Sequence, residues 1–276
     1  MKIIFKYIFS LFLGMKKLIM ILMLISSMKS FAQDSYFLGK TNYCTPEKED
    51  SKKKFDAAIL ALNSPKYYNG VTQMLLKAVK EDPTYCDAHF LAGYYFRLQD
   101  MQKEATVLYY IADSLSQNKA PIFKQNLAIQ FMRLGQVERA REKYEEMIRY
   151  FPENPEGYYG KANTSVVIGD YEAGITNLKK AEQLYRGSMK DDGKYMYGIL
   201  YALNEKYKDG LLYLEDVYSS YKNDDNYVAL YALSQIKVGK SNNDEKLIKK
   251  ARKNYDKIKG KPVTEDVIKK LQAEFP

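Results

Sequence analysis

The fold is decided by the stretch Leu127-Ala128-x-x-Phe131-x-x-x-Gly135-x-Val137-x-x-Ala140-x-x-x-Tyr144-x-x-Met147, which is followed by Pro152. Its apolar and small side chains recur every three or four residues, which is the period of an α-helix. The glycine divides the stretch, and the proline comes after its end, so neither residue interrupts a periodic segment. The stretch therefore predicts two successive helices joined by a short turn.

The same template recurs along the chain. Upstream, Ala92-Gly93-x-x-Phe96 is followed by Ala105, Tyr109 and Ala112, and downstream, Lys161-Ala162-x-x-Ser165 is followed by Gly169, Tyr171 and Gly174. Six copies begin near residues 52, 86, 121, 155, 191 and 225, at spacings of 34, 35, 34, 36 and 34 residues. A nearly constant period of this size indicates a row of similar helical units, each packed on the next.

Each well-matched copy carries a small residue in both of its helices. These residues are Gly93, Ala128, Ala162 and Gly198 in the first helices, and Ala105, Ala140, Gly174 and Gly210 in the second helices. Two helices cross closely only where the side chains between them are small, and the large Tyr, Phe and Leu positions fill the remaining gaps. We therefore expect pairs of closely crossed helices.

This pattern resembles the tetratricopeptide repeat (TPR), a helix–turn–helix unit of the same period. The resemblance covers about residues 52–260, and it implies an all-α, right-handed superhelical solenoid of about six antiparallel helix pairs. The chain departs from the family pattern by lacking the usual Trp of the first helix and by carrying about seven extra residues around 240–246. Thr264 and the acids after it predict a C-terminal capping helix over residues 264–275 that covers the end of the stack, so the repeat domain extends over 52–276.

The first 32 residues differ in kind from the rest. They contain no acidic residue, and Lys16 and Lys17 precede the apolar run Leu18–Ile25, which ends before the small residues around Ala32. This order predicts a signal peptide over residues 1–32, with cleavage near Ala32 and export to the periplasm or cell envelope. An uncleaved anchor is the alternative, and either Met1 or Met15 serves as the true start.

Export changes how the charge is interpreted. The formal net charge of +9 falls to +4 once the five lysines of residues 1–32 are removed. Nucleic acid is therefore not an expected partner. Residues 237–270 keep twelve basic against five acidic residues. This segment predicts either a contact with an acidic envelope or membrane surface, or only a solvated helical face.

The two cysteines lie at the beginning of the mature chain. Residues 33–51 form a polar N-terminal extension, in which Cys44 precedes the first repeat, and Cys86 opens the second. An exported protein is in an oxidising compartment, so we expect a Cys44–Cys86 disulfide that pins the extension. Neither cysteine has the CxxC spacing of a redox site.

The sequence contains no convincing catalytic or metal site. His89 is the only histidine, and it occupies a repeat position that is normally large and buried. The Asp191-Asp192-Gly193 and Asn223–Asn226 stretches lack the alternating acids of a calcium loop and are better explained as repeat junctions and helix caps. We expect no enzyme activity, no metal and no cofactor.

The family resemblance also implies a binding surface. First-helix residues at positions 2, 5, 9 and 12 or 13 of each repeat face the concave groove, and here they include Phe90, Tyr94, Arg97, Gln125, Arg133, Tyr159, Asn163, Tyr195 and Lys237. Tyr and Arg are common in binding hot spots. Some family members hold a peptide carboxylate in a Lys/Asn clamp. Only Asn163 matches an Asn of that clamp and Asp56 stands where a cation is needed, so we do not expect that use.

These observations predict a non-catalytic exported scaffold that binds a protein or peptide in its groove, as an adaptor in a cell-envelope assembly. The signal peptide and the Lys/Asn/Tyr-rich usage resemble exported proteins of Bacteroidota-type bacteria. The alternative is a glycan- or cell-wall-binding module, for which stacked tyrosines and a basic C-terminal end are also suited.

Overall fold

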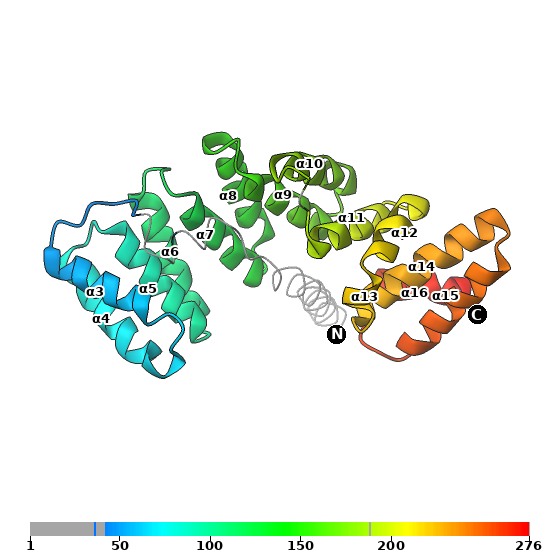
Figure 1. Ribbon diagram of the computed structural model, residues 1–276, viewed down its shortest axis with the longest axis horizontal. Helices are drawn as coiled ribbons and strands as arrows, with labels where there is room; N and C mark the ends of the chain where they lie inside the picture. Colours follow the sequence, from blue (N-terminus) through cyan, green and yellow to red (C-terminus); the bar gives the residue numbers. More distant parts are fainter. Residues whose placement is uncertain (1–35, 37–41, 188, 276) are drawn as a thin grey trace, which may run out of the picture. The chain divides into compact units, whose positions relative to one another are not determined.

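The computed structural model describes residues 36, 42–187 and 189–275 (Figure 1). The segment predicted as a signal peptide, residues 1–32, lies outside these residues. The described residues form α-helices with one short 3-10 helix, and no strand occurs among them. The chain divides into two compact parts between Gly157 and Tyr158, and each part is treated separately below.

The N-terminal part consists of consecutive helix pairs. Its elements are α3 (Glu49–Leu60), the 3-10 helix η1 (Pro65–Tyr67), α4 (Tyr68–Glu81), α5 (Cys86–Leu98), α6 (Gln102–Leu115), α7 (Pro121–Arg133) and α8 (Val137–Tyr150). Each helix packs on the next one along the chain from α3 to α8. The short segments between the helices leave room only for antiparallel neighbours, as the repeat pattern predicts.

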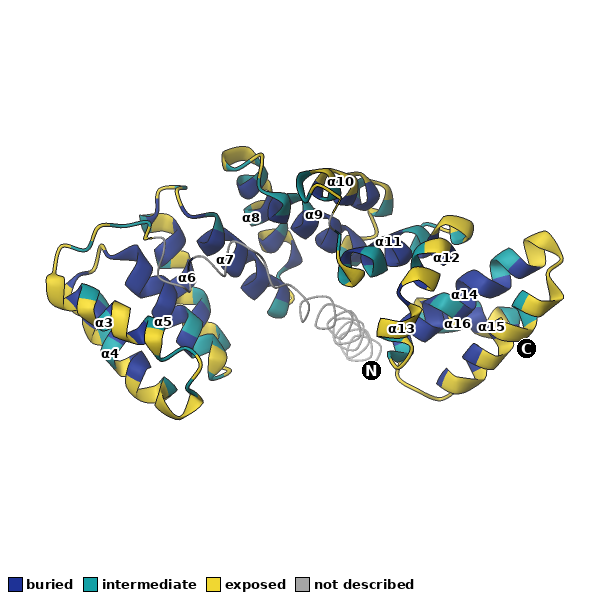
Figure 2. Ribbon diagram, in the orientation of Figure 1, coloured by how far each residue is buried: buried dark blue, intermediate teal, exposed yellow. Residues whose placement is uncertain are grey.

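The C-terminal part continues the same organisation. Helix α9 (Pro155–Ile168) begins just before the boundary and is followed by α10 (Tyr171–Leu184), α11 (Asp191–Leu203), α12 (Tyr207–Asp216), α13 (Tyr218–Tyr221), α14 (Asp225–Asn242), α15 (Glu245–Ile258) and α16 (Glu265–Glu274). Helix α11 packs on α10 and α12, and α14 packs on α12 and α15. The buried faces of these helices meet inside each pair (Figure 2). The predicted all-α repeat of helix pairs is confirmed.

The first helices begin where the repeat period places them, with two local differences. Five of them begin at residues 86, 121, 155, 191 and 225, whereas α3 begins at Glu49, three residues before the expected start. The extra residues of the last repeat lengthen its first helix, because α14 has 18 residues where α5 and α7 have 13. The insertion is therefore accommodated as about one more helical turn.

The small residues lie where the helices cross. The four alanines among them are fully buried. A Cβ atom on Gly93 of α5 would lie 2.9 Å from the Tyr109 ring of α6, and one on Gly198 of α11 would lie 2.7 Å from Leu214 of α12. Both distances are shorter than van der Waals contact, so only glycine permits this approach.

The turns inside five of the six repeats, all except the first, share one geometry. The residues Asp100, Gly135, Gly169, Glu205 and Asn243 have positive φ angles between 54° and 83°. In every case the following amide donates to a carbonyl five residues earlier, as from Gln136 to Phe131 at 2.8 Å and from Lys206 to Tyr201 at 2.9 Å. This bond closes the end of the first helix and sets the start of the second.

Helix α16 lies along α14 and also reaches earlier elements. The Glu274 carboxylate pairs with Lys237 at 2.6 Å and Lys240 at 2.7 Å, and Lys270 pairs with Glu205 in the α11–α12 turn at 2.6 Å. The helix buries Val267 and Leu271. Thr264 is the N-cap residue of α16, as predicted, but its side chain does not bond the first turn of the helix. Its hydroxyl and amide donate to Asn226 instead.

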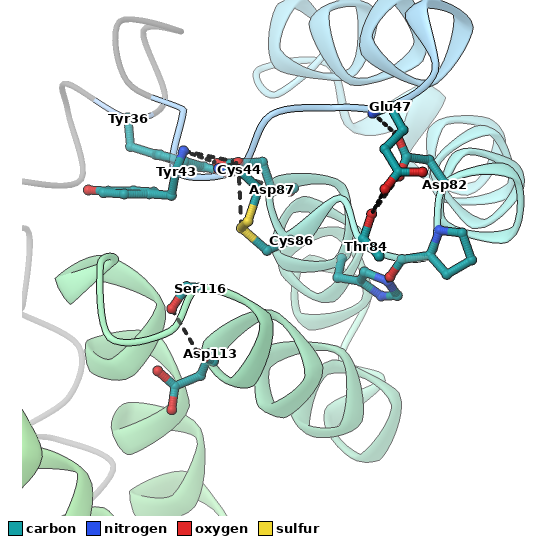
Figure 3. The surroundings of a disulfide bond; sticks show 12 residues. Tyr36, Tyr43, Cys44, Glu47, Asp82, Thr84, Cys86, Asp87, Asp113 and Ser116 are labelled. Atoms are coloured by element: carbon teal, nitrogen blue, oxygen red, sulfur yellow. Dashed lines mark hydrogen bonds between the residues drawn. A yellow bond between two sulfur atoms is a disulfide. The ribbon is translucent and has the colours of Figure 1, made fainter.

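A disulfide joins Cys44 to Cys86 at the first residue of α5 (Figure 3). Beside it, the buried Asp87 carboxylate accepts the amides of Tyr43 at 3.0 Å and Cys44 at 2.8 Å. Burial raises the pKa of Asp87, although these amides oppose the shift. The Asp82 carboxylate accepts the Glu47 amide at 2.7 Å. One covalent bond and several hydrogen bonds therefore hold the segment before α3 against the end of α4 and the start of α5.

The close crossing predicts opposite effects for two glycines. Gly93→Ala places a methyl group against Tyr109 and is expected to lower the free energy of unfolding by about 1–3 kcal/mol. Gly70→Ala is the matched control, since nothing lies within 4 Å of its added Cβ in α4; it is expected to stabilise the protein by about 0.5–1 kcal/mol. Chemical denaturation measures both values. Equal effects of the two substitutions would contradict the packing argument.

Because of the disulfide, we expect the free energy of unfolding to depend on whether Cys44 and Cys86 are oxidised. The bridge closes a separation of 42 residues, so the double variant Cys44→Ser with Cys86→Ser is expected to lose about 2–4 kcal/mol of unfolding free energy. Denaturation with and without reductant measures this loss, and intact mass spectrometry counts the thiols. Reductant should have no effect on the double variant. A wild-type chain that carries two alkylatable thiols after purification without reductant would refute the prediction.

Candidate protein-binding surface

The nine residues expected in the groove fall into two groups. The buried ones are Phe90, Gln125, Tyr159 and Asn163, with exposed fractions of 0%, 1%, 5% and 1%, and the partly exposed ones are Tyr94, Arg97, Arg133, Tyr195 and Lys237. The buried four are therefore not accessible to a partner in this structure, and the assignment of the nine as groove residues stays a prediction. The physical reasons differ among them.

Phe90 belongs to an aromatic cluster under the N-terminal segment. Its ring stacks on Phe123 of α7 at 4.4 Å between centroids and meets the edge of Tyr36 at 5.2 Å. The Tyr43 ring also contacts Phe123, at 5.2 Å. The segment that the disulfide pins thus covers the beginning of the second repeat's predicted groove face. The periodic pattern gave no sign of this, because Tyr36 and Tyr43 lie outside the repeats.

Gln125, Tyr159 and Asn163 are interior residues. The Gln125 amide donates to the Glu156 carboxylate at 2.8 Å and so links α7 to the start of α9. Asn163 is almost fully buried, and neither atom of its amide has a hydrogen-bond partner. Repeat position alone does not separate such residues from exposed ones, because neighbouring helices decide their burial.

Tyr195 and Lys237 are engaged within the C-terminal part. The Tyr195 ring lies 4.5 Å from that of Tyr221 and 5.5 Å from that of Tyr227, between centroids. Lys237 forms the ion pair with Glu274 of α16 described above. These two predicted contact residues therefore already have partners in the chain.

Tyr94, Arg97 and Arg133 form the remaining group, in the N-terminal part. The Arg97 guanidinium carbon lies 4.4 Å from the centre of the Tyr94 ring, and its Nε donates to the Tyr109 hydroxyl at 3.3 Å. Arg133 ends α7 at the equivalent place in the next repeat. Burial, and then the positive charge of Arg97, lowers the pKa of Arg133. Tyr94 and Arg97 are in contact, and all three side chains are partly accessible.

A polar cavity of about 210 Å³ lies among α6, α7 and α8. Lys124, only 2% exposed, pairs with Asp113 at 3.1 Å and Glu146 at 2.6 Å, and Lys143 pairs with the same two acids at 3.2 Å and 2.9 Å. Burial acts to raise the pKa of Glu146, but hydrogen bonds from the two lysines prevail and lower it. The lowered value is opposite to that of a general acid near neutral pH. The repeat pattern does not predict this cluster, and its one sequence signal is Lys124, a lysine at a core position.

The basic segment 237–270 is partly neutralised within the chain. Lys237, Lys240, Lys261, Lys269 and Lys270 all form ion pairs. A second set lies on one exposed face of α15, and it comprises Lys246, Lys249, Lys250, Lys253 and Lys257. The opposite face of α15 packs on α14.

Among the described residues, the helices are too short or too polar to cross a membrane.

His89 is a packed residue of α5, as expected from its repeat position. Its Nε2 donates to the Pro83 carbonyl at 2.9 Å, and its Nδ1 is buried without a partner. Burial lowers the pKa of this imidazole, against the effect of the Pro83 carbonyl. The nearby sulfur atoms of Cys44 and Cys86 are bonded to each other, so with Asp87 they do not offer a set of thiolate ligands.

The burial of His89 predicts a low titration midpoint. Protonation would place a charge on a buried Nδ1 that has no acceptor, so the imidazole is expected to titrate below pH 6.5 in an NMR pH series. A group whose pKa is lowered on folding contributes full stability above pH 6.5 and loses it as the pH falls toward the folded value. Since the chain has one histidine, the signal needs no assignment. A midpoint at or above 6.5 would disprove the buried neutral state.

Comparison with known proteins places the chain among repeat proteins. The model of the family described as Intraflagellar transport protein 56 matches residues 54–264, about three quarters of the chain. No curated protein matches the sequence.

Similar solved structures share the fold at low sequence identity. A tetratricopeptide repeat protein from Parabacteroides merdae ATCC 43184 is 17% identical with a TM-score of 0.61, over 76% of this chain and 79% of that one. PilW, a type IV pilus biogenesis factor, is 14% identical with a TM-score of 0.59, over 76% and 93%. YrrB, a TPR protein with an unusual peptide-binding site, is 18% identical with a TM-score of 0.53, over 64% and 90%.

The family match and these structures agree with the repeat period and the paired helices. The chain therefore belongs to the family described as Intraflagellar transport protein 56 and is a tetratricopeptide repeat protein.

Proposed function

We propose that the chain is a non-catalytic scaffold that binds a protein or peptide segment through the first-helix surface of its N-terminal part. The observation that carries this proposal is the group of Tyr94, Arg97 and Arg133, which is partly exposed on successive first helices. Tyr and Arg supply large contact area and directed hydrogen bonds on a rigid helix, so little conformational entropy is lost on binding. We call this group the Tyr94–Arg133 surface.

Two similar proteins support a binding role. YrrB is described by its peptide-binding site, and PilW by its part in type IV pilus biogenesis. A shared fold does not transfer a partner, because function depends on the particular residues at the surface. These two proteins support the proposal because they show that a stack of helix pairs can bind a peptide or take part in pilus biogenesis.

The proposed place of action is the cell envelope. The predicted signal peptide over residues 1–32 and the Cys44–Cys86 disulfide are both consistent with an exported protein in an oxidising compartment. The exposed lysine face of α15 is the part of the basic segment that remains for contact with an acidic envelope surface. In this proposal the chain is an adaptor that joins an envelope component to a partner protein.

Glycan or cell-wall binding is the second candidate, and a tyrosine stack favours it. The rings of Tyr197 and Tyr213 stack at 4.7 Å, and that of Tyr201 stacks on Tyr213 at 5.7 Å, between centroids. Tyrosine rings are large amphipathic surfaces of the kind that sugar rings contact. These rings already cover one another, however, so the protein-binding function is preferred.

Site-specific photo-crosslinking in the native cell tests the function. Tyr94→p-benzoylphenylalanine is expected to crosslink a discrete protein after irradiation. The matched control is Tyr110→p-benzoylphenylalanine, because Tyr110 lies on α6 and is 54% exposed. It should give no such product. The same cells, fractionated before irradiation, are expected to yield the crosslink from the envelope fraction and a mature N-terminus near residue 33.

Two outcomes would contradict the proposal. A product from position 110 alone would place the partner on the second-helix face. Binding of the purified chain to isolated cell wall, with no protein product at either position, would favour the glycan function instead.

A further inference from the structure

Helix α15 carries five exposed lysines on one side. They are Lys246, Lys249, Lys250, Lys253 and Lys257. Neighbours in this set are three or four residues apart, so all five lie within an arc of about 100° around the helix axis. At a rise of about 1.5 Å per residue, the set extends over about 16 Å along that axis. We call this set the lysine face of α15.

The opposite side of α15 fixes the direction of this face. The buried residues of the helix pack on α14, and the Asn254 amide donates to the Gln235 side-chain oxygen at 2.9 Å. A Cβ atom on Gly239 of α14 would lie 2.9 Å from the Ile248 side chain. The two helices therefore cross too closely for α15 to turn about its axis, and the lysine face is held away from α14.

The lysine face has no acidic partner in the part of the chain that the structure describes. None of its lysines pairs with a carboxylate there, and Lys257 donates to the neutral Asn254 side chain at 3.0 Å. By contrast, five other lysines of the basic segment 237–270 do pair with acids. Like charges three or four residues apart on a helix repel each other. An anionic surface in contact with the lysine face would relieve this repulsion.

The acidic residues of α15 lie beside the lysine face. Glu245 and Asp256 are both exposed, and because they are three helical turns apart, they lie along the same edge of the face. The N-cap Asp244 accepts the backbone amides of Lys246 and Leu247, both at 3.0 Å. This contact does not involve the lysine ammonium group. The acids therefore border the positive face without neutralising it.

The side chains of α15 favour a contact with many mobile anions. A lysine ammonium is a point charge on a flexible stem, whereas an arginine presents a rigid fork for directed hydrogen bonds. The one arginine of α15, Arg252, lies over the Phe275 ring at 4.5 Å and outside the lysine face. The one aromatic residue of the helix, Tyr255, is 5% exposed. The lysine face therefore offers neither a ring on which a sugar could stack nor a fixed array of donors.

We propose that the lysine face of α15 binds the surface of a bilayer that contains anionic phospholipid, through the lipid phosphate groups. This inference rests on the envelope location in the proposed function and specifies the chemistry of the surface. Lysines within one arc approach a plane of headgroups together, and each of them adds to the attraction. Because the face consists only of lysines, the contact is electrostatic and reversible, and α15 stays outside the hydrocarbon region.

Vesicle sedimentation tests the contact. The mature chain is purified after export with its disulfide intact. It is mixed with vesicles of phosphatidylglycerol and phosphatidylcholine in equal amounts, and separately with vesicles of phosphatidylcholine alone. We expect binding to the mixed vesicles at low salt that weakens by about tenfold or more at physiological salt, where the charges are screened. Equal binding to the neutral vesicles, or binding that salt leaves unchanged, would overturn the proposal.

Two variants separate the lysine face from the net charge. Lys250→Gln with Lys253→Gln removes two charges from the middle of the face and is expected to weaken binding to the mixed vesicles by about tenfold. The matched control, Lys77→Gln with Lys80→Gln, removes two exposed lysines of α4 at the same spacing and should keep most of the binding. Unfolding midpoints at or above that of the wild type verify that the face variant is folded. Equal losses in the two variants would show an effect of net charge alone and would contradict the proposal.

A change of the opposite sign extends the test. Asp256→Lys enlarges the positive face at its edge and is expected to strengthen binding to the mixed vesicles, whereas Glu104→Lys, at an exposed position of α6, makes the same charge change and should have less effect. Soluble polygalacturonate is the probe for an anionic polysaccharide. Binding to this polymer without binding to the mixed vesicles would refute the phospholipid contact and favour a glycan.

The outcome is independent of the photo-crosslinking test of the proposed function. A Tyr94 crosslink without vesicle binding would leave the protein-binding function in place and remove the membrane contact. Vesicle binding through the lysine face without a Tyr94 crosslink would leave the membrane contact in place and remove the protein-binding function.

Discussion

The helices of a repeat approach each other so closely at Gly93 and Gly198 that one added methyl group would lie under 3 Å from a side chain of the partner helix. The packing of the other helices depends on this close crossing within each pair. No helix of a pair buries its apolar face alone, so each pair is completed by the next one. In the five repeats after the first, the recurrent left-handed turn residue then fixes where the second helix begins. The order of the helices along the chain is therefore also the order in which they pack on one another.

Much of this fold could be predicted from the sequence, because the constraint is local. The small residues and the period of about 34 residues report helix crossings that lie within a short distance along the chain. The long helix α14 could not be foreseen, since an insertion of seven residues is compatible with a loop as well as with an extra turn. The contacts of α16 with the α11–α12 turn could not be predicted from the repeat pattern either, because Lys270 and Glu205 are 65 residues apart in the sequence.

The candidate site was predicted less well, for a physical reason. Repeat position indicates which way a side chain points, whereas exposure depends on what else covers that face. Phe90 was predicted to face the groove, but Tyr36 from outside the repeats lies against its ring. Lys237 forms an ion pair with Glu274 of the last helix. Tyr94, Arg97 and Arg133 remain partly exposed, and only the contacts in the structure separate them from the buried residues.

The covalent link between Cys44 and Cys86 has a mechanical consequence. Helices α3 and α4 lie in the stretch of chain that this bond bypasses. A pull on the N-terminus would reach α5 through the sulfur atoms, and the first helix pair would carry none of the tension. A tether attached ahead of Cys44 therefore strains the second repeat first, and the first pair can stay folded on its neighbour while force is transmitted past it.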